Sequence, residues 1–455
     1  MVTDYAAEGR SLAKLDGKVL FISGAVPGDV ADVLITKSKK DWAEGRVVNL
    51  REYSKERATP FCKHFGTCGG CKWQMLPYSK QLQYKQQETQ QNLARIGRVE
   101  LPEILPIIGA DDTVHYRNKL EFTFSNKRYL TSEEIGQVVD IPKQNALGFH
   151  VPRIFDKVID IEECYLMDDV NNRIRNTIRS FAAENNFSFY DIREHSGWLR
   201  NIIIRHCTTR ELMVNVCLNH EAAEDQKKLF DHLLEQVPQI TTLLYTINPK
   251  WNDSIYDLTS QVYFGKGYAI EKLEDYQFKI SAKSFFQTNT KQAEKLYSVT
   301  RDFAELTGNE IVYDLYCGTG SIGIFLSKQA KQIIGVEVIE EAIKDARENA
   351  ALNNIEHAEF YSGDVIKICN DAFFEKHGRP DVIITDPPRA GMHEKLIEKL
   401  LDIAAPRIVY VSCNTATQAR DLNLLDKKYR VEKVQPVDMF PHTHHIECVV
   451  LLKLK

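Results

Sequence analysis

Three cysteines lie close together in the segment FCKHFGTCGGCKWQ, at positions 62, 68 and 71. Glycines beside them let the backbone turn tightly, so the three sulfur atoms can converge on one metal site. A fourth ligand must come from elsewhere, and Cys164 in the segment IEECYLMDD is the best match. Four thiolates suit either zinc or an iron–sulfur cluster, and the long gap after Cys62 favours a [4Fe-4S] cluster. Unrelated free thiols, or a redox pair at Cys68 and Cys71, are the alternatives.

A glycine-rich loop, DLYCGTGSIG, runs from Asp314 to Gly323 between a predicted strand and a predicted helix. Glu337 ends the next predicted strand, where a carboxylate can accept hydrogen bonds from a ribose. The loop alone also fits NAD, or an α/β domain that binds nothing. However, Asp314 would repel a pyrophosphate, and further acids, Asp364 and Asp386, follow later strands. This series of acids favours S-adenosylmethionine, which is cationic and carries no phosphate.

Two more chemical motifs follow strands of the same region. Asp386-Pro387-Pro388-Arg389 comes directly after the predicted strand Val382–Thr385, and its prolines fix a rigid turn there. Such turns recur where methyltransferases face a planar nitrogenous target, and an ordinary pair of prolines that ends a strand is the alternative interpretation. Cys413 closes the predicted strand Ile408–Ser412, where its thiolate could act as a nucleophile. An inert buried thiol is the alternative interpretation.

Histidines and one carboxylate lie close together in the segment PHTHHIECV near the end of the sequence. A metal site is one interpretation of this segment. However, a strand at Ile446–Leu452 would place His445 and Glu447 on one face and His444 on the other, so the histidines would not converge. We therefore interpret Glu447 as a single carboxylate base.

The elements that must position these motifs differ along the chain. From residue 285 onward strands and helices alternate, which predicts a parallel, doubly wound sheet whose strand ends meet at one edge. Between residues 115 and 270, strands and the helix Asp168–Asn185 predict an α+β region. The expected strands are Leu120–Phe124, Leu147–Phe149, Ile202–Arg205, Leu212–Val216, Ile311–Tyr316, Ile333–Val338, Phe360–Tyr361, Val382–Thr385 and Ile408–Ser412.

Residues 1–58 predict a small β module, with strands at Lys18–Ile22, Val30–Ile35 and near Arg46–Leu50. Short strands separated by turn residues favour a small antiparallel barrel. Lys39 and Lys40 lie in a basic turn, which is typical of barrels that bind single-stranded nucleic acid. A solvated basic turn on a stabilising module is the alternative.

The chain has 455 residues, a net charge of −5 and 43% hydrophobic residues. This composition excludes a disordered chain, a collagen-like fibre and a uniformly basic nucleic-acid coat. No apolar run is long enough for a membrane span and no secretory leader is visible, so we expect a cytoplasmic protein. Residues 60–100 are locally basic, because six lysines and arginines there oppose two glutamates.

Taken together, the motifs resemble the RNA uracil-5-methyltransferase family, in particular its iron–sulfur branch that acts on 23S ribosomal RNA. The resemblance covers nearly the whole chain. It implies that residues 1–58 are an RNA-binding TRAM domain, and that the segment SFFQTN, Ser284–Asn289, is the family's FxQ motif. That motif would place Gln287 on the cofactor and Phe285 near the target base. The cluster branch also includes transfer-RNA enzymes in archaea.

The resemblance also implies a role for each remaining motif. Cys413 would be the nucleophile that adds to carbon 6 of uracil, and Glu447 would be the base that removes the proton from carbon 5. Ser321 stands where relatives often carry Asn, although its hydroxyl can still donate. The implied cluster ligands are Cys62, Cys68, Cys71 and Cys164. The implied cofactor contacts are Gln287, Tyr316, Ser321, Glu337, Asp364 and Asp386. The expected RNA contacts are Phe285, Arg117, Lys39 and Lys40.

We therefore expect an α/β protein with three domains in chain order. Residues 1–58 form the TRAM (OB-like) β-barrel, residues 59–270 a central α+β iron–sulfur and RNA-binding domain, and residues 271–455 a class I, Rossmann-like methyltransferase domain. The expected protein is a monomeric 23S ribosomal RNA (uracil-5-)-methyltransferase that uses S-adenosylmethionine and a [4Fe-4S] cluster. The alternatives are a transfer-RNA uracil-5-methyltransferase, a non-catalytic RNA-binding or assembly protein, an NAD-dependent redox protein, and a methyltransferase that acts on a nitrogen atom.

Overall fold

A computed structural model describes residues 1–131, 134–135 and 145–455 of the chain. These residues form two compact units. The first unit contains residues 1–61, 71–113 and 291–455, and the second contains residues 62–70 and 114–290. Each unit thus draws on separate stretches of sequence, whereas the expected domain boundaries follow chain order and stay a prediction. Within the described residues, no helix combines the length and the apolarity that a membrane crossing requires.

The N-terminal part of the first unit is a five-stranded sheet in the order β1-β2-β3-β5-β4. The strands expected near residues 18, 30 and 46 are all present. The expectation of purely antiparallel pairing is wrong at one place, because β3 and β5 are parallel. The chain reverses twice, through β4 and then β5, so β5 returns beside β3 in the same direction. The bounds are β1 (Asp4–Ala6), β2 (Arg10–Leu15), β3 (Lys18–Ser23), β4 (Val30–Ser38) and β5 (Trp42–Glu52).

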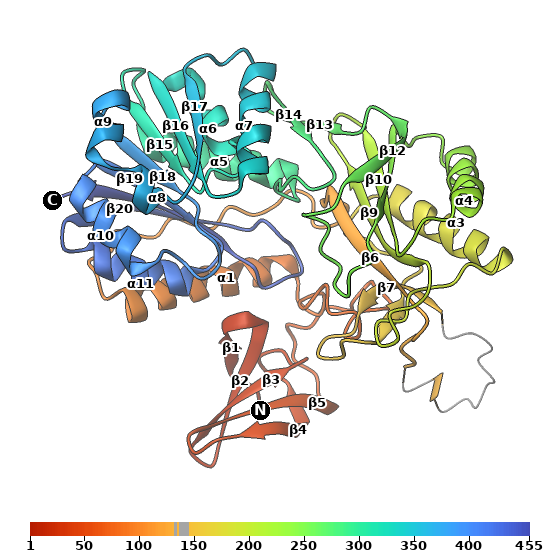
Figure 1. The fold of residues 1–455 in the computed structure, drawn as a ribbon. Coiled ribbons are helices and arrows are strands. Elements are labelled where there is room, and N and C mark those ends of the chain that lie inside the picture. The colour runs from red at the N-terminus through yellow and green to blue at the C-terminus, as the bar shows by residue number, and fades with distance from the viewer. Residues whose placement is uncertain (132–133, 136–144) are drawn as a thin grey trace. The chain divides into compact units, whose positions relative to one another are not determined.

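The C-terminal part of the first unit is a seven-stranded sheet in the order β17-β16-β15-β18-β19-β21-β20 (Figure 1). The first five strands in that order are parallel, which confirms the expected doubly wound sheet. The hairpin of β20 and β21 departs from this parallel pattern, because β21 runs antiparallel to both β19 and β20. The bounds are β15 (Ile311–Leu315), β16 (Gln332–Glu337), β17 (Ala358–Ser362), β18 (Val382–Thr385), β19 (Arg407–Ser412), β20 (Tyr429–Val437) and β21 (Glu447–Leu454).

Helices cover this sheet because neighbouring residues of each strand point to opposite faces. On one face, Leu400 of α10 and Leu422 of α11 belong to one apolar core with Tyr313 and Ile383 of the strands. On the other face, Gly323 of α6 packs closely on Ile333, which allows the helix to approach the sheet. The bounds are α5 (Thr290–Ala304), α6 (Ser321–Leu326), α7 (Glu340–Leu352), α8 (Val365–Ile368), α9 (Asp371–His377), α10 (Glu394–Ile403) and α11 (Thr415–Leu425).

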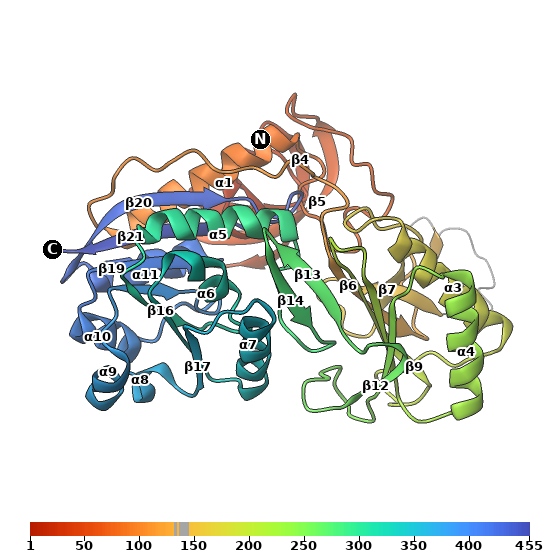
Figure 2. The same ribbon diagram turned by 90° about the horizontal axis from the view of Figure 1, so that it is seen from above.

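Helix α1 (Tyr78–Asn92) belongs to the same unit and contacts α11 (Figure 1). Figure 2 draws the same elements from above. A fully buried ion pair joins it to the chain just after β20, with Lys85 Nζ 2.6 Å from Asp438 Oδ1. The hydroxyl of Tyr78 donates to the other carboxylate oxygen at 2.8 Å. The Gln81 side chain accepts from the backbone N–H of His442 at 2.8 Å. Helix α1 therefore holds the loop that leads into β21.

The second unit is built on another seven-stranded sheet, in the order β12-β11-β10-β9-β6-β7-β8. Only β10 and β11 are parallel neighbours among the pairs that form it. This α+β arrangement matches the expectation for residues 115–270. The bounds are β6 (Lys119–Ser125), β7 (Ala146–His150), β8 (Val158–Asp160), α3 (Val170–Glu184), β9 (Leu199–His206), β10 (Leu212–Leu218), α4 (Ala223–Gln236), β11 (Thr242–Ile247), β12 (Ser260–Gly265), β13 (Ala269–Leu273) and β14 (Tyr276–Ile280).

Candidate functional site

The glycine loop after β15 makes a sharp turn into α6. Gly318 and Gly320 have positive φ values of 53° and 76°, and Tyr316 between strand and loop has φ 62°. A side chain at Gly320 would come within 3.0 Å of a ring carbon of Phe360, so this position needs glycine. Asp314 Oδ2 accepts a hydrogen bond from the backbone N–H of Gly323 at 2.9 Å. The aspartate thus anchors the first turn of α6 to the end of the strand.

A cavity of about 390 Å³ opens at the carboxyl ends of β15 and β16. The carboxylate of Glu337 accepts from the backbone N–H of Gly318 at 3.4 Å and from that of Val338 at 2.8 Å. Asp364 caps α8 by accepting from the backbone N–H of Ile366 at 3.0 Å. The lining residues are Tyr316, Val336, Glu337, Val338, Asp364, Val365, Ile366, His393, Lys395 and Leu396. Two acids beside apolar side chains suit a ribose and a flat aromatic base.

The charges around this edge fit a cationic cofactor better than a pyrophosphate. Burial, together with the nearby charges of Asp386 and Glu337, raises the pKa of Asp314 to about 7. Among the described residues, no hydrogen-bond partner reaches the buried Oδ1 atom of Asp314. A positive charge near these carboxylates would stabilise their ionised forms. The residues present therefore fit S-adenosylmethionine.

We expect Glu337→Ala to weaken S-adenosylmethionine binding by about 1.5–3 kcal/mol, because the ribose would lose a charged hydrogen-bond acceptor. RNA affinity should change little. Titration calorimetry of the cofactor measures the effect, and Glu340→Ala, an exposed acid in the first turn of α7, is the matched control. Equal cofactor affinity in both variants would contradict the assignment of this cavity.

Cys413, Glu447 and Asp386 lie near one another at the same edge of the sheet. Burial raises the pKa of the Cys413 thiol to about 11, and the charges of Glu447 and Asp386 add to that rise. Burial and the charge of Asp386 hold the pKa of Glu447 well above its usual range. Burial also raises the pKa of Asp386 to about 7. The charge of Arg389 acts to lower the pKa of the Cys413 thiol. A thiol and a carboxyl group in one pocket can serve as nucleophile and base.

Two loops that carry these groups are joined directly. The side-chain amide of Asn414 donates to the carbonyl of Arg389 at 3.2 Å, and the Thr417 hydroxyl donates to the same oxygen at 3.3 Å. Asn414 also caps α11, because its side chain accepts from the backbone N–H of Ala416. The proline turn after β18 and the cysteine after β19 are thus held side by side.

One residue of this site was not predicted. The Tyr297 hydroxyl of α5 lies 2.9 Å from the Ser321 hydroxyl, and burial raises the pKa of Tyr297. The charges of Asp386 and Glu447 also raise the pKa of the Tyr297 hydroxyl. A tyrosine in an amphipathic helix is typical of a core residue, so nothing in the sequence indicated that Tyr297 belongs to this site. Ser321 therefore already has a partner on the protein.

The histidines before β21 are placed differently from the expectation. The strand begins at Glu447, so His444 and His445 precede it and do not follow the alternation of strand faces. Their rings contact each other with centroids 4.3 Å apart. Burial lowers the pKa of His444 to about 3. Glu447 is buried, with 7% of its surface exposed, and it lies opposite Val437 of the neighbouring strand β20.

Among the described residues, the predicted cluster ligands do not form a metal site. Cys62 and Cys68 are half-buried and Cys164 is buried, all within the second unit. Burial raises the pKa of Cys164, and the charges of Cys62 and Cys68 act on it in the same direction, so the three thiols lie near one another. Cys71 belongs to the first unit. In the part of the chain that the structure describes, no three His, Cys, Asp or Glu side chains form a metal-holding group.

The remaining predicted residues divide between the two units. Phe285 is 68% exposed, and the carbonyl of Gln287 accepts from the Asn118 amide at 2.9 Å, both in the second unit. Arg117 of that unit donates to the Thr288 hydroxyl at 3.3 Å. Lys39 and Lys40 are exposed in the turn between β4 and β5 of the first unit. In that module, Lys37 lies 5.0 Å above the ring of Trp42. Their roles stay predictions.

A model of the family described as tRNA (uracil-5-)-methyltransferase matches residues 208–455, and a TRAM domain model matches residues 1–48. Two relatives are each described as an "uncharacterized RNA methyltransferase". One, from Bacteroides thetaiotaomicron, is 54% identical over 99% of this chain and 100% of the relative. The other, from Porphyromonas gingivalis, is 50% identical over 99% of this chain and 98% of the relative.

The chain also resembles solved structures, and one example covers its whole length. It is the crystal structure of Pyrococcus abyssi tRNA (uracil-54, C5)-methyltransferase in complex with S-adenosyl-L-homocysteine. The two chains are 27% identical, the TM-score is 0.76, and the match covers 99% of each chain.

Proposed function

The chain belongs to the tRNA (uracil-5-)-methyltransferase family, and on that basis we propose that it methylates carbon 5 of a specific uridine in 23S ribosomal RNA. Membership of this family establishes the general activity. The protein is an S-adenosylmethionine-dependent RNA uracil-5-methyltransferase with an N-terminal TRAM domain. The observation that carries the proposal is the gathering of Cys413, Glu447 and Asp386 beside the acid-lined cavity.

Carbon 5 of uracil is a poor nucleophile, so the proposed reaction begins with a covalent step. The thiolate of Cys413 adds to carbon 6, and the electron pair of the carbon 5–carbon 6 bond moves toward the carbonyl at carbon 4. The resulting enolate makes carbon 5 nucleophilic. S-adenosylmethionine would supply the methyl group: carbon 5 forms a bond to the methyl carbon as the bond from that carbon to the sulfonium sulfur breaks. The electron pair of the broken bond stays on sulfur, which leaves as S-adenosylhomocysteine.

Glu447 completes the proposed reaction. Its carboxylate takes the proton from carbon 5, and the freed electron pair restores the double bond while the thiolate of Cys413 leaves carbon 6. The nucleophile is thereby regenerated. The high pKa of Glu447 suits a group that must accept a proton, once a nearby positive charge favours its ionised form. Both side chains must reach one base, so the uridine must leave its stack.

The cysteine motif together with the TRAM domain supports ribosomal RNA as the target, through the resemblance to the 23S branch. A second target, transfer RNA, is favoured by the likeness to the Pyrococcus abyssi enzyme, whose described substrate is tRNA uracil 54. In either RNA, an irregular or single-stranded uridine costs less to extrude than a paired one.

Mass-spectrometric mapping of 5-methyluridine tests the target. A deletion strain should lose one or more 5-methyluridines from 23S ribosomal RNA, and the wild-type gene should restore them, whereas a Cys413→Ala gene should not. Loss confined to transfer RNA would favour the second target. Unchanged 5-methyluridine in both RNAs would contradict the proposed function.

The proposal includes a [4Fe-4S] cluster on Cys62, Cys68, Cys71 and Cys164. Three of these thiols lie near one another, and thiolates are the ligands that such clusters prefer. The cluster would tie separate stretches of chain together and would take no part in the methylation. A monomeric, cytoplasmic protein with the three expected domains completes the proposal.

Protein purified without oxygen should be brown, with about four irons and four sulfides per chain. Cys68→Ser should lose the metal and lower stability, because metal binding contributes to folding. Iron and sulfide analysis, with the absorption spectrum, measures this. Cys369→Ala, which removes a buried thiol of the first unit, is the control and should stay brown. Stoichiometric zinc without sulfide would refute the cluster.

A further inference from the structure

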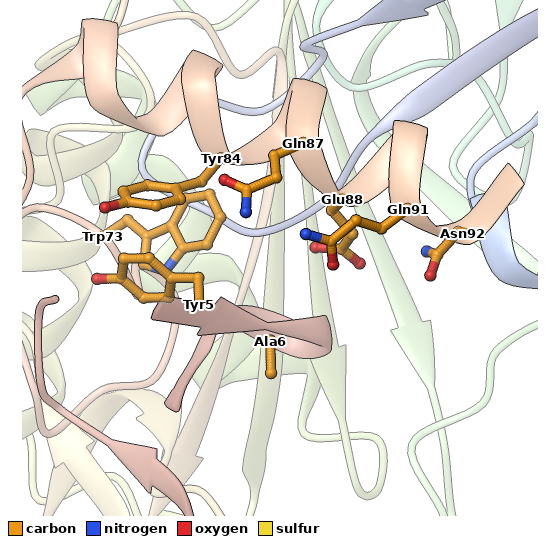
Figure 3. A pocket seen from close by; sticks show the side chains of 8 residues that line it. All are labelled: Tyr5, Ala6, Trp73, Tyr84, Gln87, Glu88, Gln91 and Asn92. Atoms are coloured by element: carbon orange, nitrogen blue, oxygen red, sulfur yellow. The ribbon is translucent and has the colours of Figure 1, made fainter. Parts of the chain in front are cut away.

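A second pocket lies within the first unit, between strand β1 and helix α1 (Figure 3). Its volume of about 50 Å³ has room for about three to five water molecules, so it can take the hydrogen-bonding edge of an RNA base but not the whole ring system. Figure 3 shows the rings of Tyr5, Trp73 and Tyr84 together at one end, with the polar side chains of α1 at the other. The lining residues are Tyr5, Ala6, Trp73, Tyr84, Gln87, Glu88, Gln91 and Asn92.

The aromatic end of the pocket is rigid. The ring of Tyr5 lies 5.2 Å from that of Trp73 and 4.5 Å from that of Tyr84. Each ring also has a polar anchor: Tyr5 donates to the carbonyl of Ala25, Trp73 to that of Gly9, and Tyr84 to the Glu56 carboxylate. Because the rings are held from several sides, the pocket is preformed.

The polar end presents hydrogen-bond acceptors. Gln87 and Asn92 use their amide N–H groups on Asp4 and on Thr415, which leaves their carbonyl oxygens for a ligand. Within the described chain, no hydrogen bond reaches the side chains of Glu88 and Gln91. Burial raises the pKa of Glu88 to about 7, against the opposing charges of Lys85 and Arg389. A half-buried carboxyl group without partners gains from a ligand that donates hydrogen bonds.

One wall of this pocket contacts the start of α11, the helix that follows the reactive cysteine. Asn92 donates to the Thr415 hydroxyl at 2.8 Å, two residues after Cys413. The charge of Arg389 acts on both the Cys413 thiol and the Glu88 carboxyl group. A nucleotide near the target uridine in the same strand can therefore reach the pocket while the uridine occupies the reaction site.

We propose that this pocket binds the hydrogen-bonding edge of a second unstacked RNA base, one that carries an amino group, from the strand that delivers the uridine. The inference rests on the proposed function and extends it to the sequence around the target. Guanine is the best match, because its ring N–H and its amino group lie side by side and can both donate to the Glu88 carboxylate. Uracil offers a single N–H flanked by two acceptors, which face the acceptors of the pocket.

The test is a double-mutant cycle between a protein side chain and a base. RNA that contains the mapped uridine is made with each neighbouring nucleotide in turn abasic, and binding to full-length protein is measured by equilibrium titration. At one position, expected to be guanine, the abasic change should weaken wild-type binding about tenfold. The Gln91→Ala and Glu88→Gln variants should bind intact RNA more weakly and lose most of the dependence on that position.

Gln90→Ala is the matched control, because Gln90 lies on the same helix and is exposed. It should behave as wild type with every RNA. Unchanged S-adenosylmethionine affinity shows that the pocket variants are folded. If Gln91→Ala and Glu88→Gln lose the same factor on intact RNA and on every abasic RNA, the base pocket is refuted. Because binding is measured without turnover, this outcome is separate from a failure to find 5-methyluridine.

Discussion

Cys413→Ala should abolish methylation and form no covalent complex with RNA, whereas Glu447→Gln should accumulate such a complex. Without the thiol, addition to carbon 6 cannot begin. Without the carboxylate base, the thiol still adds and carbon 5 still takes the methyl, but the proton on carbon 5 stays and the thiolate cannot leave. The rate at which finished 5-methyluridine is released over repeated turnovers should fall by roughly four orders of magnitude or more in each variant.

The measurement is a denaturing gel of protein and labelled RNA, together with 5-methyluridine analysis. A band that survives denaturation is expected with Glu447→Gln, and also with the wild type on RNA that carries 5-fluorouridine, because fluorine does not leave as a proton does. Cys369→Ala, in which the replaced thiol is buried in the core, should remain active and form no trapped band on unmodified RNA. Near-normal 5-methyluridine production by Cys413→Ala would rule out this chemistry.

Lys85→Met should lower the free energy of unfolding by about 3–5 kcal/mol, because it leaves the buried Asp438 carboxylate without its cation. Both side chains of this pair are fully buried, and Lys85 also donates to the carbonyl of Phe440 at 3.2 Å. Burial lowers the pKa of Lys85, and the charge of Asp438 acts in the opposite direction by favouring the ionised ammonium. Activity should fall as well, since the loop after Asp438 leads into Glu447.

Urea denaturation compares this variant with Lys80→Met, a lysine of the same helix that pairs with Glu56 at 2.6 Å while about a third exposed. That exposed pair should contribute at most about 1 kcal/mol. Adding Asp438→Asn to Lys85→Met should recover part of the lost stability, because the uncompensated charge is removed. Equal stability of the two single variants would show that the buried pair does not hold α1 in place.

Local patterns in the sequence were enough to predict most helices and strands and the chemical motifs that they carry. The alternation of strands and helices after residue 285 predicted the parallel part of the large sheet, because each element's apolar period is recorded in its own residues. Asp314 lies at the end of β15, and Asp386 and Cys413 directly follow β18 and β19. Because the carboxyl ends of parallel strands meet at one edge of a sheet, the fold class alone predicted that these motifs lie close together.

Tertiary structure alone decided the partners that lie far apart in sequence. Nothing near Lys85 indicates that its partner is Asp438, and nothing in α5 indicates that Tyr297 contacts Ser321. The parallel pairing of β3 with β5 and the insertion of β21 between β19 and β20 also depend on how separate stretches dock. The physical reason is that local periodicity reports which face of an element is buried, whereas the group that covers it is selected by packing and charge across the whole unit.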